Sequence, residues 1–318
     1  MAAIFLTEDD VRDLLDMETA IEVMEDAFRQ WGSAAASNVP RTRVQGPKIM
    51  LHTMSASADY LGLVGWKAYT TTVNGARFHV GLYSAETGAM LALIEADLLG
   101  QLRTGATSGV ATEYMARPDA HVVGLFGAGQ QAAGQLKAVC SVRKIERVEV
   151  YSRHEHRCRI FANEMSELCN TTVVPIRTPD AVAAEKDIVI CATNARTPLF
   201  DGRVLDEGTH LNVVGSNFPQ KAEVDVTTIR RADVIICDSI EQCKLEAGDF
   251  AAALEAGVTD WTLMHDLAEV VTGRQTARPT AESITLFKSV GLALEDIALA
   301  GKLVTLAQRA GLGKPLPF

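Results

Sequence analysis

The chain has 318 residues, of which 47% are hydrophobic and 22% are charged, as in an ordinary folded protein with a large core. This length is sufficient for two domains. The formal net charge of -10 argues against a general binder of nucleic acids or of anionic membranes. This net charge is compatible with a local basic pocket for an anionic metabolite.

The cysteines and the N-terminus indicate the compartment. The chain has no C-x-x-C pair, so neither a disulfide framework nor a zinc site is expected. The first ten residues lack the basic segment of a secretory signal peptide, and no apolar run has the length of a membrane span. We therefore expect a cytoplasmic protein without a metal and without a membrane partner. The six cysteines are Cys140, Cys158, Cys169, Cys191, Cys237 and Cys243.

The first 118 residues predict an α+β domain. Thr7 is typical of a helix N-cap, because three acidic residues follow it, and a second helix is expected from near Met17. A domain boundary is expected at Arg117-Pro118-Asp119. Residues 41–95 predict strands, and the candidates are 48–54, 62–71, 78–84 and 90–95, with a hairpin turn at 85–88.

Residues 119–296 predict an α/β domain in which strands and helices alternate. This alternation is typical of a doubly wound parallel sheet of the Rossmann type. A last helical stretch is predicted from Leu286 to Arg309, and residues from about 297 to 318 are expected to pack back onto the first domain. The predicted strands are 122–126, 148–151, 172–175, 188–192, 210–214 and 234–237.

A glycine turn follows the first of these strands. It reads Gly127-Ala-Gly129-Gln-Gln-Ala132 and precedes an amphipathic segment. The first glycine allows a tight turn, the second lets a pyrophosphate approach the backbone, and the small third residue allows close packing of helix on strand. The free N–H groups at the helix start then face the anion. In this strand–turn–helix context the motif predicts a dinucleotide site.

The end of the next strand indicates which dinucleotide is preferred. NAD-specific folds usually have Asp or Glu there, to bind the ribose 2′-hydroxyl. This chain has Ser152 and Arg153, followed by His154, His156 and Arg157. Arginine binds phosphate oxygens in a fork, so the cluster favours the 2′-phosphate of NADPH. The alternative is a solvated basic turn at the start of a helix.

Three cations in the first domain are candidate ligands of an anion. Arg41 follows a proline at the start of a strand, Lys67 lies in an otherwise apolar strand, and Arg103 begins a helix of small residues. Each cation alone is compatible with a solvated surface charge. That reading is weaker for Lys67, because a buried lysine needs an anionic partner or loses its proton.

Together these motifs resemble the ornithine cyclodeaminase/mu-crystallin family over nearly the whole chain. The resemblance implies a homodimer or a larger assembly of dimers, with a first domain that binds substrate and a second that holds NAD or NADP. It rests on Arg41, Gly65-Trp66-Lys67, Leu102-Arg103-Thr104-Gly105-Ala106-Thr107, Gly127-Ala-Gly129, the segment Val213–Asp225 and the segment Val290–Asp296.

The resemblance also implies roles for single residues. Those matching Arg41, Lys67 and Arg103 hold the substrate carboxylate, and Lys67 and Asn217 are the catalytic candidates. The loop from Val214 to Asn217 lies along the nicotinamide. The predicted cofactor contacts are Arg103, Thr104, Gly127, Ala128, Gly129, Gln130, Ser152, Arg153, His154, Arg157, Thr193, Val214, Gly215 and Ser216.

One position departs from the cyclodeaminases of the family. Those enzymes have Asp, a proposed acid/base, where this chain has Asn217. An amide cannot act as a general base, and cyclodeamination requires several proton transfers. The cyclodeaminases also carry an acidic residue at the second strand end, whereas ketimine reductases similar to mu-crystallin carry an Asn-Arg pair there and use NADPH. Both departures point to an NADPH-dependent reductase.

The sequence therefore predicts a reductase of a cyclic ketimine acid, with pyrroline-2-carboxylate or piperideine-2-carboxylate as substrate. NAD(H) is the less favoured cofactor. The partners expected are a small imino or amino acid and a second copy of the chain, and no nucleic acid. Two alternatives stay open: an ornithine or lysine cyclodeaminase or alanine-type dehydrogenase with the same residues, and a non-catalytic NADPH or small-ligand binding protein.

Overall fold

The computed structural model describes residues 2–317, which divide into two compact units. Unit 1 consists of Met1–Thr104 and Leu292–Phe318, and unit 2 of Gly105–Gly291. The first division falls inside a continuous helix, α3 (Asp97–Met115), ahead of the boundary that the sequence suggests at 117–119. Within the described residues, no helix is both long and apolar enough to cross a membrane.

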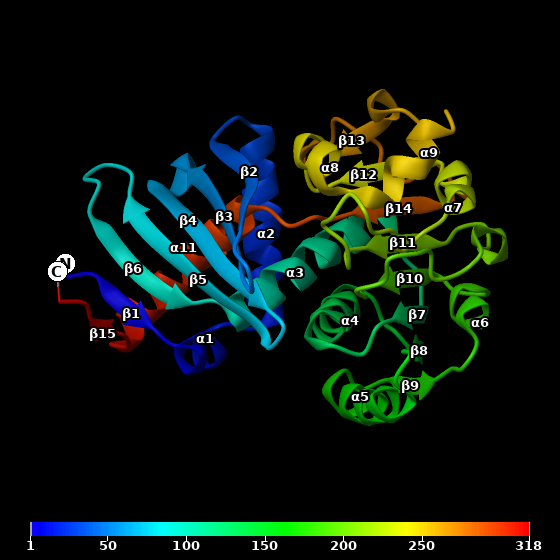
Figure 1. Cartoon of the computed structure of the whole chain (residues 1–318), viewed down its shortest axis with the longest axis horizontal. Coiled ribbons are helices and arrows are strands. Elements are labelled where there is room, and N and C mark those ends of the chain that lie inside the picture. The colour runs from blue at the N-terminus through cyan, green and yellow to red at the C-terminus, as the bar shows by residue number, and fades with distance from the viewer. Residues whose placement is uncertain (1, 318) are drawn as a thin grey trace. The chain divides into compact units, whose positions relative to one another are not determined.

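Unit 1 contains a seven-stranded sheet with the order β15-β1-β6-β5-β4-β3-β2. β1 pairs in parallel with β6 and antiparallel with β15, so the first and last strands of the chain lie together at one edge (Figure 1). These two strands are too short for a periodicity signal and were not predicted. The strands are β1 (Ile4–Leu6), β2 (Ala36–Gln45), β3 (Met50–Ala58), β4 (Leu63–Thr72), β5 (Gly75–Ser84), β6 (Met90–Glu95) and β15 (Lys314–Pro315).

Three further helices belong to unit 1: α1 (Glu8–Leu14), α2 (Met17–Gly32) and α11 (Ala293–Ala310). The predicted N-cap of α1 is confirmed, because Thr7 and Asp10 form a reciprocal capping box. Asp16 caps α2 without a reciprocal bond, since its side chain accepts a hydrogen bond from the backbone N–H of Thr19. The helix α11 packs against α2 and against β3 and β4, so the C-terminal segment covers the sheet of the first domain.

The predicted start of the last helix at Leu286 is wrong. Residues 285–288 form strand β14 (Thr285–Lys288), which lies inside the sheet of unit 2 between β12 (Val234–Cys237) and β11 (His210–Val213). The helix begins only at Ala293, because Gly291 has a φ of +80° and Leu292 is extended. A short apolar run of this kind does not distinguish a buried strand from a buried helix by its periodicity.

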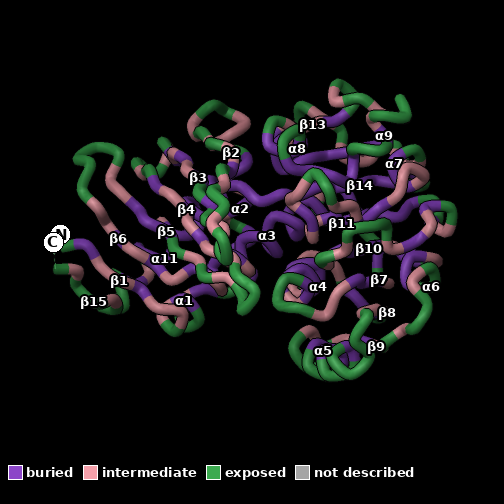
Figure 2. The backbone as a smooth tube through the Cα atoms, in the orientation of Figure 1, coloured by how far each residue is buried: buried purple, intermediate pink, exposed green. Residues whose placement is uncertain are grey.

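Unit 2 contains a parallel sheet, as the sequence predicted. It has eight strands, because β13 and β14 join the six predicted ones, in the order β13-β12-β14-β11-β10-β7-β8-β9. Two apolar clusters cover it, one with α4 and α5 and the other with α6, α7, α8 and α9. The strands between them are the most buried part of the unit (Figure 2). The remaining strands are β7 (Val122–Phe126), β8 (Arg147–Tyr151), β9 (Thr172–Pro175), β10 (Ile188–Cys191) and β13 (Met264–Asp266).

The helices of unit 2 are mostly short. The described residues also form short 3-10 helices, η1 (Asp59–Leu61) in unit 1 and η2 (Gly202–Val204), η3 (Gly248–Phe250) and η4 (Trp261–Leu263) in unit 2. The α-helices are α4 (Gln130–Val142), α5 (Glu155–Leu168), α6 (Pro179–Ala183), α7 (Val226–Arg231), α8 (Ile240–Glu246), α9 (Ala251–Glu255) and α10 (Leu267–Val271).

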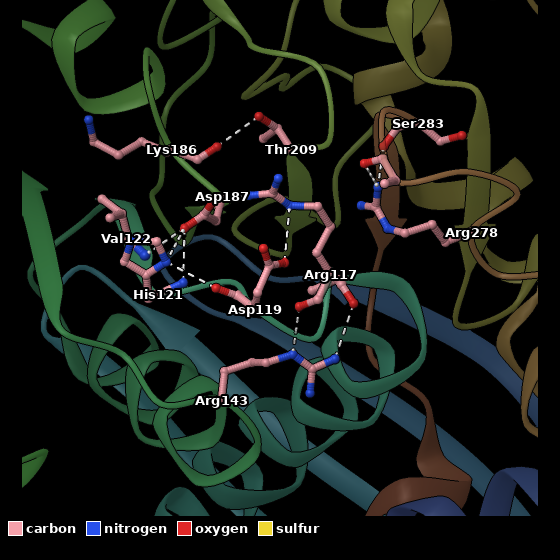
Figure 3. A network of polar contacts seen from close by, with 12 residues as sticks. Arg117, Asp119, His121, Val122, Arg143, Lys186, Asp187, Thr209, Arg278 and Ser283 are labelled. Atoms are coloured by element: carbon pink, nitrogen blue, oxygen red, sulfur yellow. Dashed lines mark hydrogen bonds and ion pairs between the residues drawn. The ribbon is translucent and has the colours of Figure 1, made fainter.

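A polar network secures the end of the sheet at which β7 and β10 begin (Figure 3). Asp187 precedes β10 and accepts the backbone N–H of His121 at 2.9 Å and a hydrogen bond from Arg117. Arg143 and Arg278 donate to backbone carbonyls at the end of α3 and just beyond it. These guanidinium groups satisfy carbonyls that have no partner within the helix.

The buried His210 on β11 predicts acid sensitivity. Burial, chiefly, lowers its pKa from 6.5 to about 3, and Arg278 adds to the shift. Between these values the unfolded chain binds a proton that the folded protein excludes, so stability is lost as the pH falls below 6.5. We expect the free energy of unfolding to decline less steeply from pH 6.5 to 4 in His210→Gln. Urea denaturation at several pH values measures this, and parallel curves for the two proteins would contradict it.

Candidate functional site

The glycine turn has the geometry that the sequence predicted. Gly127 has a φ of +113°, and a Cβ there would lie 2.4 Å from the carbonyl oxygen of Ala192. Gly129 is extended, forms the N-cap of α4 without a side-chain hydrogen bond, and has open space where a Cβ would lie. The turn therefore requires glycine at its first position and leaves room for a ligand at the second.

This turn opens into a cavity of about 730 Å³ at the carboxyl ends of the parallel strands. Ligands of open α/β sheets bind at this edge, and the volume is that of a cofactor site. The cavity brings together eight of the predicted cofactor contacts, from three strand ends. They are Gly127, Ala128, Gly129, Ser152, Arg153, His154, Arg157 and Thr193.

The basic wall of the cavity is broader than the sequence suggested. Arg153, His154 and Arg157 are exposed, and Arg153 donates to the side-chain oxygen of Asn194 at 3.0 Å. Arg196 also lines the cavity, from the segment after β10. Arg196 was not predicted, although its place five residues after the end of the parallel strand β10 was an available signal. His156 does not line this cavity.

The other predicted cofactor contacts lie elsewhere. Gln130 is exposed at the first position of α4, and Val214, Gly215 and Ser216 form the loop after β11, which also contains the half-buried Asn217. Arg103 and Thr104 belong to unit 1.

The loop after β11 rests on charged groups for which the sequence suggested no role, although Glu223 lies in the segment Val213–Asp225 that carries the family resemblance. Glu223, Asp249 and Lys288 are all buried. Glu223 accepts the backbone N–H groups of Thr193 and Gly215, each at 2.7 Å. Burial, reinforced by Asp249 and opposed by Lys288, raises the pKa of Glu223 to about 7. No periodic pattern marks these residues, because their partners come from four different segments.

In unit 1 the predicted cations are buried and paired with the start of α11. Lys67 Nζ lies 2.7 Å from Asp296, and Arg103 lies 2.5 Å from Glu295 and 3.3 Å from Asp296. The anionic partner that a buried Lys67 requires is therefore Asp296. Burial and Arg103 lower the pKa of Lys67 to about 8, against the opposing effect of Asp296.

Arg41 completes this group of cations. It is buried on β2, and its guanidinium carbon lies 6.0 Å from the centre of the Tyr69 ring. Tyr69 in turn stacks on His52, with ring centres 4.1 Å apart. Arg41 and Arg103 both act electrostatically on Lys67, so the three cations form one cluster.

The sequence matches the ornithine cyclodeaminase/mu-crystallin family over residues 1–308. The chain belongs to this family. This membership agrees with the glycine turn, the cation cluster and the mixed α/β architecture described above. Among residues 2–317, no group of His, Cys, Asp and Glu has an arrangement that would hold a metal ion.

Several members of known identity are similar over their full length. A Δ1-pyrroline-2-carboxylate reductase of Bacillus cereus is 31% identical, with 98% of this chain and 99% of that protein covered. The Thermococcus litoralis Δ1-pyrroline-2-carboxylate reductase, solved with NADH and L-proline, is 33% identical with a TM-score of 0.94, over 98% of this chain and 100% of that one. An archaeal alanine dehydrogenase dimer with bound NAD is 30% identical with a TM-score of 0.94, over the whole of both chains.

Proposed function

We propose that this protein is an NADPH-dependent reductase of a cyclic ketimine acid, with pyrroline-2-carboxylate or piperideine-2-carboxylate as substrate. The observation that carries the proposal is the match to pyrroline-2-carboxylate reductases over the full length of the chain. Asn217 supports it, because a ketimine arrives with its C=N bond already formed and needs no general base at this loop.

The cation cluster supports a substrate that carries a carboxylate. Arg41 and Arg103 would bind the carboxylate oxygens, while Lys67 would add a contact or orient a proton-donating water. Lys67 and Arg103 are already held by Asp296 and Glu295, so these cations would need little rearrangement to receive a carboxylate.

The residues of the cavity in unit 2 would hold the dinucleotide. Gly127 and Gly129 would admit the pyrophosphate to the start of α4, and the segments at Thr193 and at 214–217 would flank the nicotinamide. The cofactor supplies the hydride when bound. The protein contributes orientation and charge placement.

The proposal includes a preference of this protein for NADPH over NADH, whereas the two solved relatives described above contain NADH or NAD. It is supported by the basic wall at Arg153, His154, Arg157 and Arg196, and by Ser152 at the strand end where NAD-specific folds carry an acid. Guanidinium groups match the 2′-phosphate in geometry and charge, and they gain less from a neutral 2′-hydroxyl.

The assembly and the compartment are also proposals. A homodimer is supported by the dimeric alanine dehydrogenase, and the cytoplasm by six free thiols. The similarity to that enzyme makes reductive amination of a 2-oxo acid the second candidate activity.

The function is tested by an NADPH-oxidation screen of the purified protein. We expect turnover with the five- and six-membered cyclic ketimine acids, and little with pyruvate plus ammonia. Ornithine should release no ammonia at a useful rate, because Asn217 cannot act as a base. Asn217→Asp should lower the reductase activity, since it adds a negative charge near the substrate carboxylate. Ammonia release from ornithine by the wild-type protein, at a rate comparable to ketimine reduction, would contradict this assignment.

The cofactor preference is tested with Arg153→Ala. Charged hydrogen bonds to a phosphate contribute about 1.5–3 kcal/mol, so NADPH should bind the wild-type protein at least ~10-fold more tightly than NADH. The variant should lose this advantage and bind NADH as before. Fluorescence titration with both dinucleotides measures the four dissociation constants. His156→Ala is the matched control, because His156 is basic and nearby but outside the cavity. Equal wild-type affinities would refute the preference.

The carboxylate site is tested with Arg41→Gln. Loss of charged hydrogen bonds worth about 1.5–3 kcal/mol should raise KM for the ketimine by roughly 10–100-fold, and a thermal melting curve shows whether the variant is folded. A change at Arg103 is combined with one at Glu295, because removal of the guanidinium alone takes away an ion-pair partner of this buried carboxylate, at a cost of about 3–5 kcal/mol. Arg103→Gln combined with Glu295→Gln avoids this. A folded Arg41→Gln enzyme with unchanged KM would remove Arg41 from the site.

A further inference from the structure

The loop after β11 has an unusual buried support, which consists of Glu223, Asp249 and Lys288. Glu223 and Lys288 are fully buried and Asp249 nearly so, with relative exposures of 0%, 0% and 3%. Burial of three charged groups is costly, and apolar side chains of similar volume would often be as stable in their place. Stability alone therefore does not account for the cluster, and its contacts indicate what it does.

Glu223 connects the ends of two neighbouring strands. One carboxylate oxygen accepts the backbone N–H and the hydroxyl of Thr193, each at 2.7 Å, and the other accepts the backbone N–H of Gly215 at 2.7 Å. Thr193 follows β10 and lines the cavity, whereas Gly215 follows β11. A single carboxylate thus fixes the spacing of two segments just beyond the point where the sheet's own hydrogen bonds end.

Asp249 and Lys288 hold the same loop from its other side. Asp249 accepts the backbone N–H of Glu223 at 2.6 Å and lies 2.8 Å from Lys288 Nζ. Lys288 also donates to the carbonyl oxygen of Ser216 at 2.8 Å. The Gly215 N–H and the Ser216 carbonyl are therefore both bound by this cluster, which leaves the intervening backbone little freedom.

The packing is close enough to require glycine in the loop. A Cβ on Gly215 would lie 2.3 Å from the carbonyl oxygen of Thr193 and 2.4 Å from the Glu223 carboxylate. The three hydrogen bonds to Glu223 occupy both of its oxygens, and the side chain is not exposed. Glu223 is therefore suited to position the loop and not to exchange protons with a substrate.

We propose that Glu223, supported by Asp249 and Lys288, is the positioning residue that sets the segments at Thr193 and at 214–217 for the nicotinamide. The nicotinamide part rests on the proposed function; the ordering of the loop does not. The glycine turn and Arg153 belong to other segments. Loss of Glu223 should therefore impair the hydride-transfer geometry much more than the affinity for the dinucleotide.

The first test measures order in the loop and needs no activity. Glu223→Gln places an NH2 group against a backbone N–H donor, so amide hydrogen exchange in a peptide covering 212–222 should become at least ~10-fold faster. A peptide covering 122–135, which contains the glycine turn, should exchange as in the wild type. Glu246→Gln is the matched control, because Glu246 is equally buried and bonds to Gln242 on α8. Unchanged protection of 212–222 in a folded Glu223→Gln protein would overturn the proposal.

The second test separates positioning from binding. In Glu223→Gln we expect kcat for ketimine reduction to fall by ~10–100-fold, while the dissociation constant of NADPH changes by less than about threefold. An equal loss of affinity, or an unchanged kcat, would overturn the positioning role. If Glu223→Gln does not fold, Glu223→Asp retains the charge but retracts it by one methylene, and the same two measurements apply.

The pH dependence of kcat distinguishes a positioning role of Glu223 from a purely structural one. The groups that face Glu223 are Asp249, Lys288 and the Cys191 thiol. Because the pKa of Glu223 is raised to about 7, the wild-type kcat should rise between pH 6 and 8, as the carboxylate becomes able to accept all three hydrogen bonds. This step should be absent in Glu223→Gln and present in Glu246→Gln. A wild-type protein without ketimine turnover would refute the proposed function, and the exchange experiment would still decide the role of Glu223 in the loop.

Discussion

The pairing of buried charges is the constraint on which unit 1 depends. Lys67 and Arg103 lie in an apolar interior, where an uncompensated cation costs several kcal/mol. Their partners, Asp296 and Glu295, come from the first turn of α11, about 190 to 230 residues further along the chain. The C-terminal helix therefore belongs to the first unit for an electrostatic reason as well as for its apolar face. The same pairing fixes the cations of the candidate substrate site.

The same residues serve the fold and the proposed chemistry. Lys67 and Arg103 are buried and are held by the two carboxylates at the start of α11. Cations held in this way are ordered before a substrate binds, so a carboxylate that reaches them would meet a preorganised site.

In unit 2 the candidate binding site and the contacts that hold the sheet to α3 lie at opposite ends of the strands. At the carboxyl ends of its parallel strands, glycines, hydroxyls and a basic wall surround an open cavity. At the opposite ends, Asp187, Arg117 and Arg143 tie the start of the sheet to the end of α3 (Figure 3). The cluster of Glu223, Asp249 and Lys288 holds the segments that follow β10 and β11, where the hydrogen bonds between these two strands have ended. Side chains are needed to hold the backbone there, because it no longer pairs with a neighbouring strand.

The sequence by itself indicated the family, the parallel sheet, the glycine turn and the three cations that we propose bind the substrate, because each is marked by local residue type, spacing or an apolar run. It did not determine that Leu286 lies in a strand, since a four-residue buried strand resembles a helix segment until its neighbours β11 and β12 are known. Only the tertiary structure brought Arg196 to the basic wall and paired Lys67 with Asp296. Only the tertiary structure showed that Glu223 binds Thr193 and Gly215, because hydrogen bonds between distant segments depend on how the chain folds back on itself and not on any local pattern.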